Sequence, residues 1–194
     1  MSGFVCGTQF SDMSKVQEIK VKKVNLPKSF NLSKNIYDVI NQGSRGICCS
    51  VSLTDTIKYW ENFKKVNYKL SRDYFWLNRA NKKIDGMTIR EAMDIAKKNK
   101  FITTYGKLQD IDSVKTVLVT QGPVILALPC YEDDTYFWRK IGNLRGGHAV
   151  VLVGYNEKGF ILKNSWGKSY GNGGYIIFPY EDFKLIREIW TIFN

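Results

Sequence analysis

The sequence predicts an α+β fold with a helical N-terminal lobe, an antiparallel β C-terminal lobe and a cleft between them. Between residues 48 and 121, apolar residues recur at three- and four-residue steps, which is typical of amphipathic helices. After Pro123 the pattern changes to short runs rich in Val, Ile and Leu, which is typical of strands. Helices and strands that are segregated along a chain favour an α+β arrangement.

The chain is expected to divide at residue 26. Residues 1–25 are polar with weak periodicity and are expected to form an N-terminal extension, called here the N-terminal arm. The domain is expected over residues 26–194, because Leu26-Pro27 starts an extended segment. Its helical lobe should cover about 26–121 and its β lobe about 122–194.

A central core helix is predicted to begin at Cys48. Its apolar stripe follows the helical period through Cys49, Leu53, Ile57 and Trp60. The preceding segment, residues 41–46, is rich in Gly, Ser and Asn and is expected to be a loop.

Three shorter helices are expected after this core helix. Ser71 is predicted to cap a helix that ends near residue 81. Thr88 and Glu91 form the capping box of the next helix, whose C-terminal lysines complement its dipole. Asp112 is expected to open the last one.

Strands are predicted in the second half of the chain at Val124–Leu128, Gly147–Tyr155, Phe160–Asn164 and Gly174–Phe178. The last segment, Phe183–Phe193, is expected to form a strand, alone or after a short helix.

A catalytic pair is predicted at one end of a hairpin. The turn at Asn156–Gly159 would pair the strand that follows His148 with the strand that precedes Asn164. The hairpin should therefore bring His148, the single histidine, beside Asn164. A side-chain amide that holds an imidazole fixes its tautomer, as a catalytic base requires.

The nucleophile that such a base requires is predicted at Cys48. A helix N-terminus and a neighbouring imidazolium both stabilise a thiolate and lower the pKa of a thiol. The alternatives are that Cys48 is a buried core thiol, that Cys49 is the nucleophile, or that Asn164 caps a turn. Cys49 falls on the apolar stripe, which favours a core position for it.

Composition bounds the partners. The net charge is +11, which leaves nucleic acid, virion or anionic-membrane association open, but the lysines are scattered and favour a solvated surface. No apolar run approaches ~18 residues, so no membrane span is expected. No metal or cofactor is implied, and a monomer is expected.

The motifs resemble those of the papain-like cysteine proteases. The resemblance covers about residues 26–180 and rests on the order Cys, His, Asn and on three segments. These are Gln42–Cys49 (QGSRGICC), Gly147–Val150 (GHAV) and Lys163–Gly167 (KNSWG). It implies a cysteine endopeptidase that acts on polypeptides through an acyl-enzyme.

The resemblance also implies roles for individual residues. Gln42 would join the backbone N–H of Cys48 in the oxyanion hole, and Trp166 would cover the His148–Asn164 bond. Gly86, Met87 and Gly147 would contact substrate.

This sequence departs from the family pattern at several places. Arg45 replaces a disulfide cysteine, and only Gly86 survives of a substrate-binding glycine pair. His148 and Asn164 follow Cys48 by 100 and 116 residues, less than the usual separation of ~130–150. The β lobe should therefore be trimmed. An acyltransferase or amide hydrolase, or a weakly catalytic binding protein with this fold, are the rival functions.

The cysteines and the N-terminal arm bear on location and regulation. Cys6 and Cys130 are expected to be free thiols, since adjacent cysteines suit no ordinary disulfide framework and no signal peptide is seen. An intracellular or virion-associated protein is expected. The arm is expected to be a loose leader; the alternative is that it docks over the cleft, anchored by Phe4-Val5-Cys6 and Phe10, with Cys6 near Cys48.

Overall fold

The longest strand, β6 (Gly146–Asn156), is central to the sheet of the computed structural model, which describes residues 6–132 and 135–194. It pairs antiparallel with β5 (Val124–Cys130) and with β7 (Gly159–Lys163). The hairpin closes at Asn156 opposite Gly159, as predicted, and β8 (Tyr175–Pro179) continues the sheet beyond β7.

The remaining strands extend the sheet into the helical half of the chain. β9 (Glu188–Phe193) joins β5 to β4 (Thr104–Lys107), and both pairings are antiparallel. Three two-residue strands complete the sheet: β1 (Thr8–Gln9), β2 (Phe30–Asn31) and β3 (Met87–Thr88).

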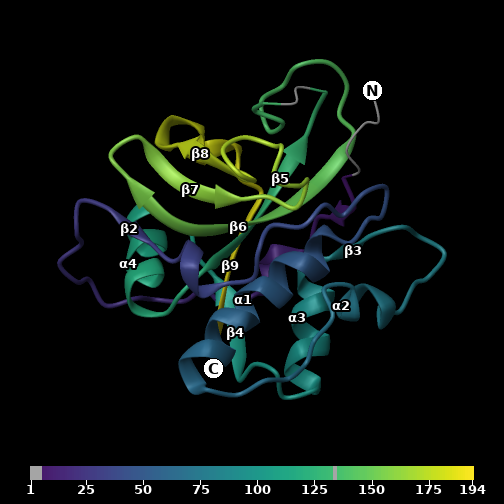
Figure 1. The fold of residues 1–194 in the computed structure, drawn as a ribbon, viewed down its shortest axis with the longest axis horizontal. Coiled ribbons are helices and arrows are strands. Elements are labelled where there is room, and N and C mark those ends of the chain that lie inside the picture. The colour runs from purple at the N-terminus through teal and green to yellow at the C-terminus, as the bar shows by residue number, and fades with distance from the viewer. Residues whose placement is uncertain (1–5, 133–134) are drawn as a thin grey trace.

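The helices are α1 (Cys48–Lys64), α2 (Tyr74–Leu77), α3 (Ile89–Lys98) and α4 (Ile111–Thr120). Figure 1 shows α1, α2 and α3 on one side of the molecule, while the curved strands β6, β7 and β8 form the other. Short 3₁₀ turns occupy Met13–Lys15, Ser33–Asn35 and Tyr180–Leu185. Across the described ranges, none of the helices is long and apolar enough to span a bilayer.

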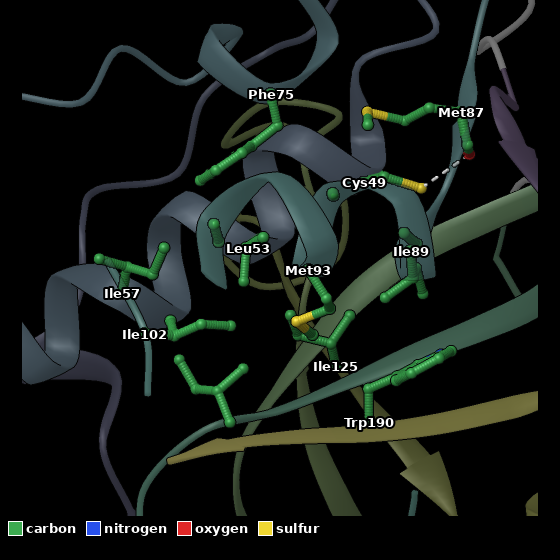
Figure 2. Packing of buried hydrophobic residues seen from close by; sticks show 14 of the residues in the cluster. Cys49, Leu53, Ile57, Phe75, Met87, Ile89, Met93, Ile102, Ile125 and Trp190 are labelled. Atoms are coloured by element: carbon green, nitrogen blue, oxygen red, sulfur yellow. Dashed lines mark hydrogen bonds between the residues drawn. The ribbon is translucent and has the colours of Figure 1, made fainter. Parts of the chain in front are cut away.

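The apolar stripe of α1 forms the core of the helical side. Cys49, Leu53 and Ile57 are almost completely buried against α3 and the faces of β5 and β9 (Figure 2). Burial of one such Leu or Ile side chain contributes about 1.5–3 kcal/mol. This packing fixes α1 rigidly under the sheet and so fixes the position of its first residue, Cys48.

The predicted α+β two-lobe fold is confirmed. α1 begins at Cys48 as expected, and each predicted strand is present within two residues of its predicted limits. The final segment contains a 3₁₀ turn followed by β9.

The helix predicted at 71–81 is wrong in length. Only Tyr74–Leu77 is helical, because the Asn78 side-chain amide donates to the Tyr74 carbonyl (2.8 Å) and caps the turn. Phe75 is buried as predicted, but Leu77 is 49% exposed. The strand β4 was not predicted.

The predicted capping box of α3 is only half formed. Thr88 accepts the Glu91 backbone N–H (3.0 Å), as expected. The Glu91 carboxylate, however, accepts the backbone N–H of Ala80 (2.6 Å), which lies in the loop after α2. Glu91 therefore binds the preceding loop to α3 in place of completing the box.

The prediction that Cys6 and Cys130 are free thiols is wrong, because the two residues form a disulfide. Thr8 pairs with Gly147, and Cys130 pairs with Gly146 on the same strand β6. Cys6 therefore meets the end of β5. The bond joins residues 124 positions apart, which no local pattern could indicate.

Candidate active site

Helix α1 places the Cys48 thiol at its N-terminal end. Ile47, the residue before the helix, supplies no side-chain cap, so the first-turn N–H groups and the helix dipole act on this position. Cys48 has an exposed fraction of 0%. The thiol therefore lies at a site that stabilises an anion and is closed to solvent.

The two adjacent cysteines differ in acidity. Burial acts to raise the pKa of the Cys48 thiol, but the neighbouring Cys49 thiol, the His148 imidazole and the Thr8 hydroxyl together hold this pKa well below its ordinary value. Burial and the neighbouring Cys48 raise the pKa of Cys49 well above its ordinary value. Cys49 donates to the Met87 carbonyl (3.2 Å, Figure 2). The surroundings of Cys48 therefore favour the thiolate, whereas those of Cys49 favour the neutral thiol.

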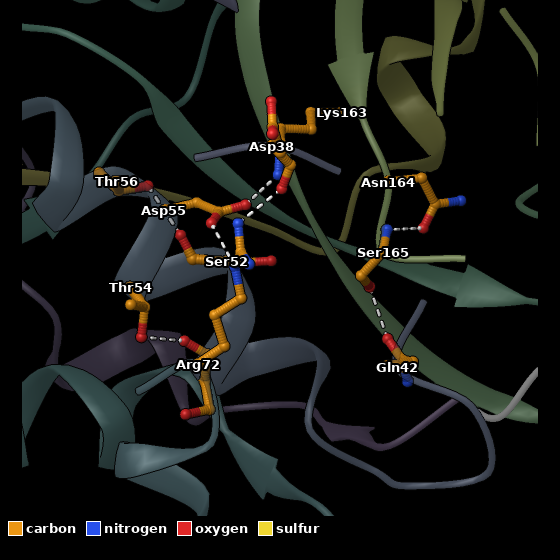
Figure 3. Close-up of polar contacts among 11 residues, drawn as sticks. Asp38, Gln42, Ser52, Thr54, Asp55, Thr56, Arg72, Lys163, Asn164 and Ser165 are labelled. Atoms are coloured by element: carbon orange, nitrogen blue, oxygen red, sulfur yellow. Dashed lines mark hydrogen bonds and ion pairs between the residues drawn. The ribbon is translucent and has the colours of Figure 1, made fainter. Parts of the chain in front are cut away.

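His148 and Asn164 lie side by side, as the hairpin predicts. His148 Nε2 is 2.8 Å from Asn164 Oδ1, and this oxygen also accepts the Ser165 backbone N–H (2.7 Å, Figure 3). The Ser165 N–H identifies this atom as the oxygen of the Asn164 amide. An amide oxygen can only accept a hydrogen bond, so His148 Nε2 must carry the donated proton. Within the residues that the structure describes, Nδ1 is buried without a hydrogen-bond partner, which leaves it as the nitrogen that can exchange a proton.

Aromatic rings enclose the imidazole. Trp166 stacks on His148 with ring centroids 4.5 Å apart and an angle of 20°. Phe137 meets the imidazole edge-on at 5.2 Å and contacts Trp166 at 4.9 Å. Trp166 and Phe137 are 2% and 0% exposed. These rings keep water from the His148–Asn164 bond, where the low dielectric strengthens it.

Gln42 joins the loop that precedes Cys48 (residues 41–46) to the segment after Asn164. Its backbone N–H donates to the Ser165 carbonyl (2.8 Å), and its Oε1 accepts the Ser165 hydroxyl (2.5 Å, Figure 3). Nε2 donates to the Arg45 carbonyl (2.9 Å). These three hydrogen bonds fix the Gln42 side chain between the loop that precedes Cys48 and the segment after Asn164.

The N-terminal arm lies over the thiol. Thr8 Oγ1 is 3.0 Å from Cys48 Sγ and 3.1 Å from Cys49 Sγ. The backbone of Thr8 pairs with Met87 and with Gly147, two of the residues predicted to contact substrate. The expected loose leader is therefore not seen from residue 6 onward. The anchors Phe4 and Val5 lie outside the described residues.

A family model, described as papain family cysteine protease, matches residues 6–184. The chain belongs to the papain family of cysteine proteases.

Solved structures and curated relatives agree with this membership. A cysteine protease from Xylella fastidiosa, xylellain, superimposes with a TM-score of 0.82 at 22% identity, over 100% of this chain and 96% of that one. At that identity the match shows the fold. A peptidase C1-like protein of Acanthamoeba polyphaga mimivirus is 50% identical over 52 residues, 24% of this chain and 17% of the relative.

A viral cathepsin of Adoxophyes honmai nucleopolyhedrovirus is 39% identical over 74 residues, 34% of this chain and 22% of the relative. These alignments span well under two thirds of the length of the curated relatives.

A buried ionic network in this papain family chain was missed by sequence reasoning. The Lys163 ammonium pairs with the Asp55 carboxylate, and both side chains are at most 2% exposed. Arg72 Nε lies 3.4 Å from the same carboxylate, and Arg72 Nη2 donates to the Asp38 carbonyl (2.6 Å, Figure 3). The network joins α1 directly to β7, so it ties the helix that carries Cys48 to the strand that precedes Asn164.

Other functional neighbours carried little signal in the sequence. Phe137 lies in an irregular segment after β5, and Ser165 is a common residue whose partner is distant. Thr8 reaches the thiol through the arm. The one hint in the sequence was Lys163, a charged residue in an otherwise apolar strand. A buried lysine usually needs an acidic partner, which here is Asp55.

Proposed function

We propose that the chain is a cysteine peptidase that hydrolyses peptide bonds through a Cys48 acyl-enzyme. The observation that carries the proposal is the 2.8 Å contact between His148 Nε2 and Asn164 Oδ1 beside a Cys48 thiol whose pKa is well below its ordinary value. An ionised thiol with an oriented imidazole is the arrangement that nucleophilic acyl transfer needs.

The chemistry divides among the residues in two steps. The Cys48 thiolate attacks the scissile carbonyl, and His148 gives its proton to the leaving amine. Asn164 keeps the imidazole in place through Nε2. Water, deprotonated by His148, then cleaves the thioester and restores the thiolate.

Oxyanion stabilisation is assigned to Gln42 and to the Cys48 backbone N–H. The Cys48 N–H lies at the start of α1, where backbone donors have no intrahelical partner. The Gln42 side chain is an amide donor that its bonds to Arg45 and Ser165 hold in the loop directly before Cys48, where the oxyanion would form.

The residues proposed to bind the substrate backbone are Gly86, Met87 and Gly147. Trp166 is proposed to contribute indirectly, by stacking on His148. The arm supports this assignment, because its own backbone pairs with Met87 and Gly147. Met87 donates its N–H to the Gly7 carbonyl (3.2 Å). A substrate strand could use the same groups once the arm has left.

A peptide-library digest read by mass spectrometry tests the proposal. The full chain, incubated with a dithiol, should cleave a subset of peptides, and Cys48→Ala should cleave none. Cleavage that persists in Cys48→Ala would contradict the assigned nucleophile. Transfer of the acyl group from Cys48 only to an added amine, and never to water, would contradict a peptidase.

For the setting of the protein, we propose an intracellular or virion-associated role. Relatives from mimivirus and a nucleopolyhedrovirus support it. The Cys6–Cys130 disulfide does not support an intracellular setting, because disulfides persist more readily in oxidising compartments. Detection of the chain in purified virions or infected-cell lysate would agree with the proposal, and its confinement to the culture medium would contradict it.

A further inference from the structure

The N-terminal arm bridges both walls of the site. β1 runs parallel to β3 on the helical side and pairs antiparallel with β6 on the sheet side. Thr8, which lies between them, is 4% exposed, while Cys48 and His148 are both at 0%. In this arrangement the backbone groups that a substrate would use are taken and the thiol is covered.

The arm packs closely against the loop that precedes Cys48 (residues 41–46). A Cβ on Gly7 would lie 2.3 Å from the Gly46 Cα, and a Cβ on Gly86 would lie 2.0 Å from the Gly7 carbonyl oxygen. Both contacts are with backbone, which cannot swing aside. A peptide substrate and the arm therefore cannot occupy this position together.

The arm is fastened on each side of Thr8. On one side, the disulfide joins Cys6 to Cys130 at the end of β5. On the other, the Ser11 backbone N–H and hydroxyl both donate to the Glu188 carboxylate of β9. The strand β1 itself is only two residues long, and so short a pairing is weak without such anchors.

We propose that the Cys6–Cys130 disulfide is a redox latch that holds the arm over Cys48, and that a small thiol reductant opens the site. Cys6 is partly exposed whereas Cys130 is 2% exposed, so an incoming thiolate has access to the Cys6 sulfur. The inference rests on the proposed function, since it concerns access to the same nucleophile.

A dithiol reagent would reduce the Cys6–Cys130 disulfide in two thiol–disulfide exchange steps. Its thiolate attacks Cys6 Sγ, forms a mixed disulfide and expels the Cys130 thiolate. Its second thiol then displaces the Cys6 thiolate. The protein gains two electrons and two protons as two thiols, and the reagent leaves as a cyclic disulfide.

Release after reduction follows from the loss of the covalent anchor. With the disulfide intact, β1 re-forms beside Cys48 whenever it opens, because its end stays at the site. With the disulfide reduced, the Ser11 contacts and two residues of pairing remain to hold residues 6–9. The population of open molecules should rise, and the rate of any reaction at Cys48 should rise with it.

The test measures the rate at which a Phe-Ala dipeptidyl diazomethyl ketone alkylates Cys48. The full chain is compared before and after incubation with dithiothreitol, which is removed before labelling. Cys6→Ser and Cys130→Ser are prepared in parallel, with circular dichroism as the check on folding. Peptide mapping locates the adduct and reports the state of the disulfide.

Reduction should raise the Cys48 labelling rate of the wild type by about tenfold or more. Both Ser variants should label at the fast rate with or without dithiothreitol, which also controls for recovery of oxidised Cys48. If the Ser variants label fast but the wild type labels equally fast before and after reduction, the latch is overturned. If no form labels at Cys48, the proposed function fails instead. If a Ser variant unfolds, the reduced and oxidised wild type still decide the outcome.

Discussion

The Cys48 thiol is completely buried, yet its pKa is lowered. Burial alone favours the neutral thiol, so the lowering depends on Cys49, His148 and Thr8. Cys49 has the same burial and lacks the imidazole, and its pKa moves in the opposite direction. Cys48 and Cys49 are therefore neighbouring residues of the same type whose thiol pKa values are shifted in opposite directions.

This difference predicts the pH dependence of labelling. In the Cys6→Ser variant, iodoacetamide should alkylate Cys48 at a rate that holds as the pH falls from 8 to 6, because a thiolate persists above its lowered pKa. Cys49 should remain unlabelled over this range. Peptide mapping at each pH gives the profile, and a Cys48 midpoint near the ordinary thiol value of ~8.5 would contradict the account.

The His148–Asn164 contact predicts unequal effects of two substitutions. His148→Ala removes the group that carries the proton and should lower kcat by about 10²–10⁴-fold. Asn164→Ala removes only the group that orients the ring, so the loss should be smaller. Steady-state kinetics on one fluorogenic peptide would compare them, with circular dichroism to show that both are folded. Equal losses would mean that Asn164 does more than orient.

Among the elements, α1 and the β6–β7 hairpin could be predicted because their signals are local. The stripe from Cys49 to Trp60 follows the helical period, and the turn at 156–159 fixes the register of two strands. The helix α2 could not be predicted in length, since Asn78 ends it with a side-chain bond. The strand β4 pairs with β9 at the far end of the chain and bridges to Glu18 in the arm, so its partners lie far from it in sequence and no local pattern signals a strand.

The Asp55–Lys163 pair predicts how strongly α1 depends on β7. Lys163→Met leaves the buried Asp55 carboxylate with the longer Arg72 contact alone, and should lower the free energy of unfolding by about 3–5 kcal/mol. Lys158→Met, on the exposed turn of the same hairpin, is the matched control and should change it by less than about 0.5 kcal/mol. Urea unfolding measures both, and equal stabilities would show that the pair is not structural.

On the scale of the whole molecule, the arm and the disulfide are long-range features that the sequence did not reveal. The disulfide joins positions 124 apart, and the arm reaches Cys48 only because β1 pairs with both β3 and β6. Docking of the arm was the less favoured interpretation of a polar leader. The positions of Cys48, His148 and Asn164, in contrast, were predictable, because a helix start places Cys48 and a hairpin end brings His148 beside Asn164.

The fit of the arm predicts that a side chain at Gly7 displaces it. Gly7→Val would bring a Cβ within 2.3 Å of the Gly46 backbone, so residues 6–9 should leave the site and the rate of peptide hydrolysis by the disulfide-bonded chain should rise several-fold. Gln9→Val is the matched control, because Gln9 is an exposed position of the same strand. If both variants hydrolyse at the wild-type rate, the arm does not cover the site in solution.

The central claim is that Cys48, and not its neighbour, is the nucleophile of a peptidase. The most direct measurement is the rate of hydrolysis of a fluorogenic peptide by Cys48→Ala and by Cys49→Ala, both reduced and both shown to be folded. We expect no activity above background for Cys48→Ala and most of the wild-type activity for Cys49→Ala, because Cys49 lies in the core, where its thiol donates to the Met87 carbonyl. An active Cys48→Ala beside an inactive Cys49→Ala would contradict it.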